Sequence, residues 1–178
     1  MDFFAHGFWS YIFFNHLKKP WLAVIFGLLP DSISWGLYFI FNLLTGQLNS
    51  GPPIVENIPS WVFGLYGLGH SLIISLLVIM VVFLIVKKTP YFMLAWPIAI
   101  IIDIFTHTRE FLPTPFLWPL SEWKFPGISW GTWQFMLLNY SLIIIGLIYI
   151  FLNRFYLTKN KKTRKSKSAS GRTFKQKI

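Results

Sequence analysis

The chain has 178 residues, of which 54% are hydrophobic, 20% aromatic and only 12% charged, and its mean hydropathy is +0.56. This composition leaves too few polar side chains to cover a soluble domain of this length, so it predicts an integral membrane protein. The net charge of +10 would suit a nucleic-acid-binding protein, but nine of the 16 Lys and Arg residues follow Tyr156 and belong to the C-terminal end. The absence of cysteine excludes disulfides, thiolate metal ligands and a cysteine nucleophile.

The first predicted element is the apolar stretch from Phe3 to Leu17, which is shorter than a membrane span and is expected to form a short or interfacial helix. The stretch from Trp21 to Leu44 is long enough to cross a membrane, although Pro30 and Asp31 lie near its middle. The stretch from Thr45 to Ser60 is rich in Gly, Pro and Asn, and therefore predicts a polar loop outside the bilayer core.

The stretch from Trp61 to Val86 is the clearest predicted span. Pro90 to His107 follows after a turn so short that the two helices are expected to form an antiparallel hairpin. Thr108 to Gly131 contains several prolines and many aromatic residues, which predicts a loop at the headgroup plane, and Trp133 to Leu152 is the last predicted span. The expected fold class is all-α, a polytopic membrane bundle of four or five helices.

The residues after the last span are mostly Lys, Arg, Ser, Thr and Asn. Residues 158–178 are therefore expected to form a disordered basic tail, and residues 1–157 the membrane-embedded domain. A basic tail beside a span indicates the cytoplasmic side and contact with anionic lipid headgroups, and nucleic acid is the less favoured partner. With the tail inside, the basic residues of the predicted short turns also face the cytoplasm: Lys18, Lys19, Lys87, Lys88 and Arg154. Only Arg109 and Lys124 remain outside.

Apart from His16 near the end of the first stretch, five histidine and aspartate side chains fall within the predicted apolar segments: His6, Asp31, His70, Asp103 and His107. A charged group at the bilayer centre costs about 2.5–3.5 kcal/mol on insertion scales, so such residues usually face the bundle interior and mark a function. A rise of about 1.5 Å per residue places all of them between the midplane and the outer face. Asp103 and His107, four residues apart, share one helix face. Aspartate and histidine from several helices match the ligands of zinc, or of manganese or iron, and predict a divalent metal site.

Each of these residues also has a purely structural explanation. His70 alone would suit a hydrogen bond between packed helices, and Asp103 with His107 would suit a buried ion pair that sets the helix register. Asp31 would suit an N-cap at a break after Pro30. Four other polar residues are expected to be interfacial or solvated: Asp2, His16, Glu56 and Glu122.

Several short motifs follow one another in a distinctive order. They are His6 near the start, Leu28-Leu29-Pro30-Asp31, Gly69-His70-Ser71-Leu72, Ile102-Asp103-Ile104-Phe105-Thr106-His107-Thr108 and Phe116-Leu117-Trp118-Pro119-Leu120-Ser121. From about residue 5 to residue 131 this order resembles the membrane-bound metal-dependent hydrolases of bacteria and archaea, a group that includes a LexA-regulated inner-membrane protein. The resemblance implies a hydrolase of the plasma membrane, with a metal held by His6, Asp31, His70 and Asp103 and with His107 as a further ligand.

The chain departs from the pattern of that family at four positions. Leu65, Tyr66 and Gly69 stand where the family usually has His, Arg and Thr, and Ala99 stands where it often has His. The departures leave room for a degenerate or single-metal site.

The leading functional hypothesis is a membrane-embedded metal-dependent hydrolase that acts on an ester or phosphoester, in keeping with an amphiphilic substrate. Zinc is the favoured metal, with manganese or iron as alternatives. Glu110, one turn beyond His107, is the predicted general base, and His6 is expected to complete or gate the site. The alternative is a non-catalytic membrane protein, either an assembly partner or a small ion or proton carrier that uses Asp31 and Asp103.

Overall fold

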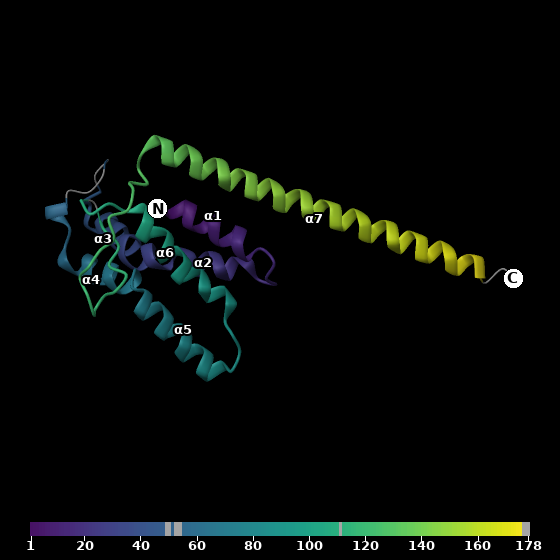
Figure 1. Cartoon of the computed structure of the whole chain (residues 1–178), viewed down its shortest axis with the longest axis horizontal. Helices are drawn as coiled ribbons and strands as arrows, with labels where there is room; N and C mark the ends of the chain where they lie inside the picture. Colours follow the sequence, from purple (N-terminus) through teal and green to yellow (C-terminus); the bar gives the residue numbers. More distant parts are fainter. Residues whose placement is uncertain (49–50, 52–54, 111, 176–178) are drawn as a thin grey trace.

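The computed structural model describes the backbone of residues 1–48, 51, 55–110 and 112–175, and their side chains up to Leu157. Within these ranges the regular structure is helical and no β-strand occurs, so the predicted all-α class is confirmed. The helices drawn in Figure 1 are α1 (Phe3–Phe14), α2 (Pro20–Asp31), α3 (Leu37–Thr45), α4 (Ser60–Gly69), α5 (Leu72–Val86), α6 (Ala95–Thr106) and α7 (Trp133–Lys175). Short helical turns at Ser32–Gly36, Val55–Asn57 and Tyr91–Leu94 complete them.

Among the described residues, two helices are long and apolar enough to cross a membrane. They are Pro20–Thr45, in which a π-helical turn joins α2 to α3, and the Trp133–Leu157 part of α7. These helices match the predicted spans from Trp21 to Leu44 and from Trp133 to Leu152. The chain therefore has the helices of a membrane protein, as the composition indicated.

The predicted span from Trp61 to Val86 is apolar enough to cross a membrane only when two bent helices are taken together as one broken span. The chain forms two helices there, α4 and α5, which are bent by 56° at a break after Gly69. Ser71 begins the second helix, because its hydroxyl accepts a hydrogen bond from the backbone N–H of Ile74 at 3.2 Å. The following predicted span, from Pro90 to His107, is also shorter than expected, since the helical residues there are Tyr91–Thr106.

Pro30 does not end the second predicted span. A π-helical turn at Ser32–Gly36 follows it, and the hydroxyls of Ser32 and Ser34 donate to the carbonyls of Leu28 and Pro30 at 2.7 and 3.0 Å. The helix therefore continues through the break. Asp31 makes no capping bond at this turn, so the N-cap explanation of this residue is wrong.

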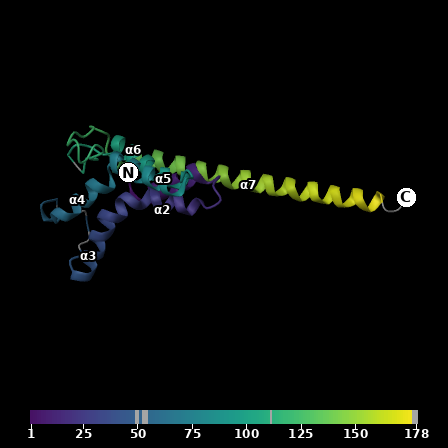
Figure 2. The ribbon, with the colours of Figure 1, turned by 90° about the horizontal axis from the view of Figure 1, so that it is seen from below.

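The loops fall at two opposite ends of the molecule, as Figures 1 and 2 show from two directions. The α1–α2 loop, which carries Lys18 and Lys19, and the turn after α5, which carries Lys87 and Lys88, lie toward the end at which α7 finishes. Arg154 of α7 reaches this end, where its guanidinium donates to the Asn15 carbonyl at 3.2 Å. The α3–α4 connection and the long loop before α7 lie at the other end.

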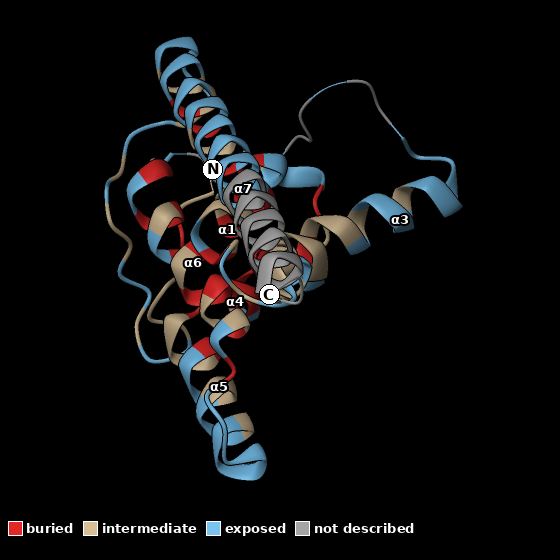
Figure 3. Cartoon of the chain, turned by 90° about the vertical axis from the view of Figure 1, so that its right-hand side faces the viewer, coloured by how far each residue is buried: buried red, intermediate tan, exposed pale blue. Residues whose placement is uncertain are grey.

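The buried residues gather where α1, α2, α4 and α6 meet, whereas the far half of α5, α3 and most of α7 up to Leu157 are exposed (Figure 3). Small residues lie at these contacts, and Ala5, Ala23 and Ala95 are fully buried. The predicted division into a membrane-embedded part, 1–157, and a disordered tail, 158–178, stays a prediction. The backbone of α7 is helical to Lys175, and the tail side chains lie outside the described residues.

Candidate functional site

The carboxylate of Asp103, on the last turns of α6, is the centre of a buried polar cluster. Its side chain is 1% exposed. The N-terminal ammonium of Met1 contacts its Oδ1, and the Nε2 atom of His6 lies 2.9 Å from the same oxygen. Nδ1 of His107 is 3.5 Å from Oδ1, and Nε2 of His70 is 3.6 Å from Oδ2. Groups from the start of the chain, from the α4–α5 break and from α6 therefore meet at one carboxylate.

Asp31 joins this cluster through His70. Nε2 of His70 lies 3.4 Å from Oδ1 of Asp31, which α2 presents just after Pro30. The imidazole of His70 is thus placed between two carboxylates on different helices, and its side chain is 1% exposed. The structure brings all five predicted ligand residues into one cluster, which we call the polar cluster: His6, Asp31, His70, Asp103 and His107.

Backbone carbonyls set the tautomers of two of these histidines. Nδ1 of His70 is 3.1 Å from the Tyr66 carbonyl, and Nδ1 of His107 is 3.1 Å from the Asp103 carbonyl. A carbonyl only accepts, so both Nδ1 atoms donate and both Nε2 atoms carry a lone pair when the rings are neutral.

The lone pair of His70 consequently faces two carboxylate oxygens. Its Nε2 atom and Oδ2 of Asp103 are both buried and make no hydrogen bond. A lone pair opposite two anions is unfavourable in a buried place unless positive charge lies between them. This arrangement fits either a bound cation or a second proton on the imidazole.

His6 has a different part in the cluster. Because a carboxylate only accepts, its Nε2–H donates to Asp103 at 2.9 Å, and its buried Nδ1 makes no hydrogen bond. In this arrangement His6 orients the carboxylate of Asp103. The predicted ligand role of His6 would require its ring to turn or to change tautomer.

The break between α4 and α5 places His70, and Gly69 makes the break possible. A Cβ atom at position 69 would lie only 2.9 Å from the Pro30 carbonyl oxygen, so a glycine is needed for α4 to approach α2 so closely. The freed carbonyl of Gly69 accepts a hydrogen bond from the Trp96 indole N–H at 2.7 Å. Glycine at position 69 therefore permits the contact that brings His70 to Asp31.

The long loop before α7 covers the break and the end of α6. Its backbone N–H groups at Gly127, Ile128 and Trp130 donate to the carbonyls of the last residues of that helix at 3.0–3.1 Å. The carbonyl of Phe116 accepts from the N–H of Leu72 at 3.0 Å, at the start of α5. The loop predicted between Thr108 and Gly131 is thus an irregular cover over the polar cluster.

A cavity of about 860 Å³ adjoins the polar cluster. Asp31 and His107 line it on the polar side, and its other walls are mainly aromatic: Phe3, Phe4, Trp35, Phe39 and Trp130. This volume lies within the range typical of small-molecule sites, about 300–1,000 Å³. The cavity therefore offers a molecule both an apolar enclosure and access to the polar cluster.

Glu110 and Asp2, two further carboxylates named in the sequence analysis, lie outside the polar cluster. Glu110 is exposed in the loop after α6 and is absent from the lining of the cavity, so its role as general base stays a prediction. Asp2, expected to be solvated, instead caps α1 by accepting from the Ala5 N–H at 3.0 Å and also accepts from the Tyr140 hydroxyl at 2.8 Å.

Sequence reasoning missed several residues that support the cluster. Tyr66 stacks on His70 with ring centroids 4.0 Å apart, and its hydroxyl donates to the Leu112 carbonyl at 2.9 Å. Met1 and Trp96 contribute through the contacts described above. The sequence signal that could have indicated the contact of Tyr66 with His70 is its position one helical turn before that residue.

The side chains do not form a finished ligand set. In the described part of the chain, no group of three or more His, Cys, Asp or Glu residues is arranged to hold a metal ion. Around His70, however, the separations of 3.4 and 3.6 Å agree with the spacing of about 3.4 Å between ligands of a tetrahedral zinc ion.

Fold and cluster together define an all-α protein with helices of membrane-spanning length and a buried group of carboxylates and imidazoles. In comparisons with known proteins, no family model, no curated protein and no solved structure matches the chain. The resemblance of its motifs to membrane-bound metal-dependent hydrolases stays a prediction.

Proposed function

We propose that this chain is a membrane-embedded metal-dependent hydrolase whose divalent ion, zinc by preference, binds between Asp31, His70 and Asp103. The observation that carries the proposal is the lone pair on Nε2 of His70, which faces one oxygen of each carboxylate at 3.4 and 3.6 Å. A divalent cation between these three atoms removes the unfavourable arrangement. His107 lines the adjoining cavity and is the further ligand.

The proposal includes a multi-pass bundle of four or five helices in the plasma membrane of a bacterium or archaeon. The broken pair α4–α5 and the short helix Tyr91–Thr106 add to the two long helices. Basic residues gather at the end at which α7 finishes, which supports a cytoplasmic C-terminus by the positive-inside rule. Anionic lipid headgroups are the proposed partners of the basic tail. The polar cluster then opens toward the outer side.

A divalent ion bound there would supply a Lewis acid that polarises an ester or phosphoester and lowers the pKa of water. The protein's own groups hold the site in place. The His6 N–H orients Asp103, and the Tyr66 carbonyl holds the His70 ring so that Nε2 points to both carboxylates. The aromatic walls of the cavity exclude bulk water from the substrate. Glu110, outside that lining, has no step in the proposal.

Metal analysis of the purified protein tests the proposal. After dialysis with zinc, the wild type is expected to retain one zinc ion per chain, and the double variant His70→Ala, Asp103→Ala is expected to lose it. His16→Ala is the matched control, because this histidine is exposed in the α1–α2 loop. Asp103→Asn, which keeps the side-chain shape, serves if the double variant does not fold. A metal-free wild type, or equal zinc in the double variant, would contradict the proposal.

One observation favours a second candidate, a small proton or cation carrier. Oδ1 of Asp103 already contacts the Met1 ammonium and the His6 N–H, and a second proton on His70 would complete the cluster without metal. For such a carrier, substitutions at His70 and Asp103 are expected to change pH-dependent flux into liposomes, and neither the wild type nor the variants are expected to have hydrolytic activity. Equal flux in protein-containing and empty liposomes would remove it.

A further inference from the structure

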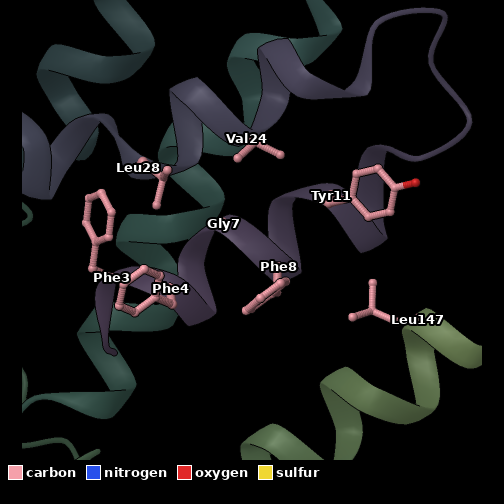
Figure 4. A pocket seen from close by; sticks show the side chains of 8 residues that line it. All are labelled: Phe3, Phe4, Gly7, Phe8, Tyr11, Val24, Leu28 and Leu147. Carbon is pink, nitrogen blue, oxygen red and sulfur yellow. The ribbon is translucent and has the colours of Figure 1, made fainter.

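A second cavity lies beside the first, along one face of α1. It has a volume of about 400 Å³ and its walls are apolar side chains from α1, α2 and α7 (Figure 4). We call it the α1 groove. Its lining residues are Phe3, Phe4, Gly7, Phe8, Tyr11, Val24, Leu28 and Leu147. Figure 4 shows Phe3 and Phe4 at one end, Tyr11 toward the other, and Leu147 of α7 across from Phe8.

The α1 groove adjoins the cavity at the polar cluster. Phe3 and Phe4 line both, and the larger cavity also reaches Asp31 and His107. One molecule can therefore occupy the two cavities, with a polar end at the cluster and an apolar end beside α1. Such a molecule is an amphiphile, because the α1 groove has only apolar walls, whereas Asp31 and His107 line the larger cavity.

The dimensions of the groove favour an alkyl chain over another helix. From Phe3 to Tyr11 the rise of α1 is about 12 Å, and a helix of that length and of about 10 Å diameter would fill about 900 Å³. The groove has about 400 Å³. Water is disfavoured as well, since an apolar lining offers it too few hydrogen-bond partners.

We propose that the α1 groove binds an acyl chain of the substrate, so that the substrate class is an acyl lipid whose ester or phosphoester reaches the polar cluster. This inference rests on the proposed function. In the reaction, the C–O or P–O bond of the ester breaks. The acyl or phosphoryl group takes the hydroxyl group of water, the leaving oxygen takes the proton, and no further co-reactant is needed. The two spanning helices α2 and α7 flank the groove, so a lipid can enter it from the bilayer.

Gly7 is the position at which the groove can be closed with least damage. A Cβ atom there would lie 3.4 Å from Leu28 Cδ2, an ordinary contact, so a larger side chain enters the groove without a clash at its first atom. Gly64 of α4 is the matched control, because a Cβ atom there meets nothing within 4 Å. The variants Gly7→Leu and Gly64→Leu therefore make the same change inside the groove and away from it.

The test is photocrosslinking in vesicles of phosphatidylcholine that carries a diazirine near the end of one acyl chain, followed by mapping of the labelled residues. In the wild type and in Gly64→Leu, labelling is expected at Phe8, Tyr11 and Leu147 above that of the exposed face of α5. In Gly7→Leu, labelling of these residues is expected to fall about tenfold. Leu147→Trp, which narrows the groove from α7, is the second variant if Gly7→Leu does not fold.

Groove labelling equal to that of α5, or unchanged in both blocking variants, would overturn the inference, because the probe would then report general lipid contact. A crosslink to a second copy of the chain would also overturn it. Zinc content measured on the same samples separates the two proposals. If zinc is bound and the groove is not labelled, this inference alone is contradicted. If the groove is labelled and no zinc is bound, the proposed function fails, and the bound lipid is then no substrate.

Discussion

Replacing Gly69 by alanine tests the contact that brings His70 to Asp31. The added Cβ would lie 2.9 Å from the Pro30 carbonyl oxygen and 3.0 Å from Ile33 Cδ1, whereas ordinary contacts begin at 3.4 Å. The α2 and α4 helices must then move apart by several tenths of an ångström. Overpacking of this kind costs about 1–3 kcal/mol. The better helix propensity of alanine offsets at most about 1 kcal/mol, so Gly69→Ala is expected to lower the stability.

The assay is thermal unfolding in detergent, followed by tryptophan fluorescence, together with zinc affinity measured by competition with a chelator. Gly64→Ala is the control, because the same atom meets nothing within 4 Å there, and it is expected to be at least as stable as the wild type. Displacing His70 from Asp31 is expected to weaken zinc binding about 10- to 100-fold, as for other positioning residues of metal sites. If both alanine variants unfold alike and bind zinc alike, the close α2–α4 contact does not build the site.

Two further predictions concern the break and the membrane orientation. Trp96→Phe removes the N–H that donates to the buried Gly69 carbonyl at 2.7 Å, and is expected to lower the free energy of unfolding by about 1–3 kcal/mol. Trp133→Phe, at an exposed position, is expected to leave it unchanged, and equal losses in both would contradict the role of the hydrogen bond. Single cysteines, Gln47→Cys and Thr89→Cys, have no background in this cysteine-free chain. An impermeant maleimide is expected to label the first from outside in spheroplasts and the second only in inverted vesicles, and labelling of both from one side would refute the proposed bundle.

The long helices could be predicted because hydropathy over about 20 residues is a local property of the sequence. Pro20–Thr45 and Trp133–Leu157 were found in this way. The break at Gly69 could not be found, since the sequence is apolar on both sides of it. It depends on Trp96, which is distant in sequence and takes the freed carbonyl, and on the approach of Pro30.

The polar cluster was predictable for a physical reason. Ionisable residues in apolar helices must avoid lipid, so residues at one depth on several helices tend to meet. Glu110 was predicted to lie one turn beyond His107, and its role as general base stays a prediction. The α6 helix instead ends at Thr106, His107 has an extended backbone, and the chain turns away.

Anomalous diffraction at the zinc edge, from crystals of the zinc-loaded protein, tests the central claim most directly. The account expects one peak within about 2.0–2.2 Å of Nε2 of His70 and of an oxygen of both Asp31 and Asp103. Zinc bound elsewhere, or a zinc-free cluster in which His70 keeps its direct contacts with both carboxylates, would contradict it.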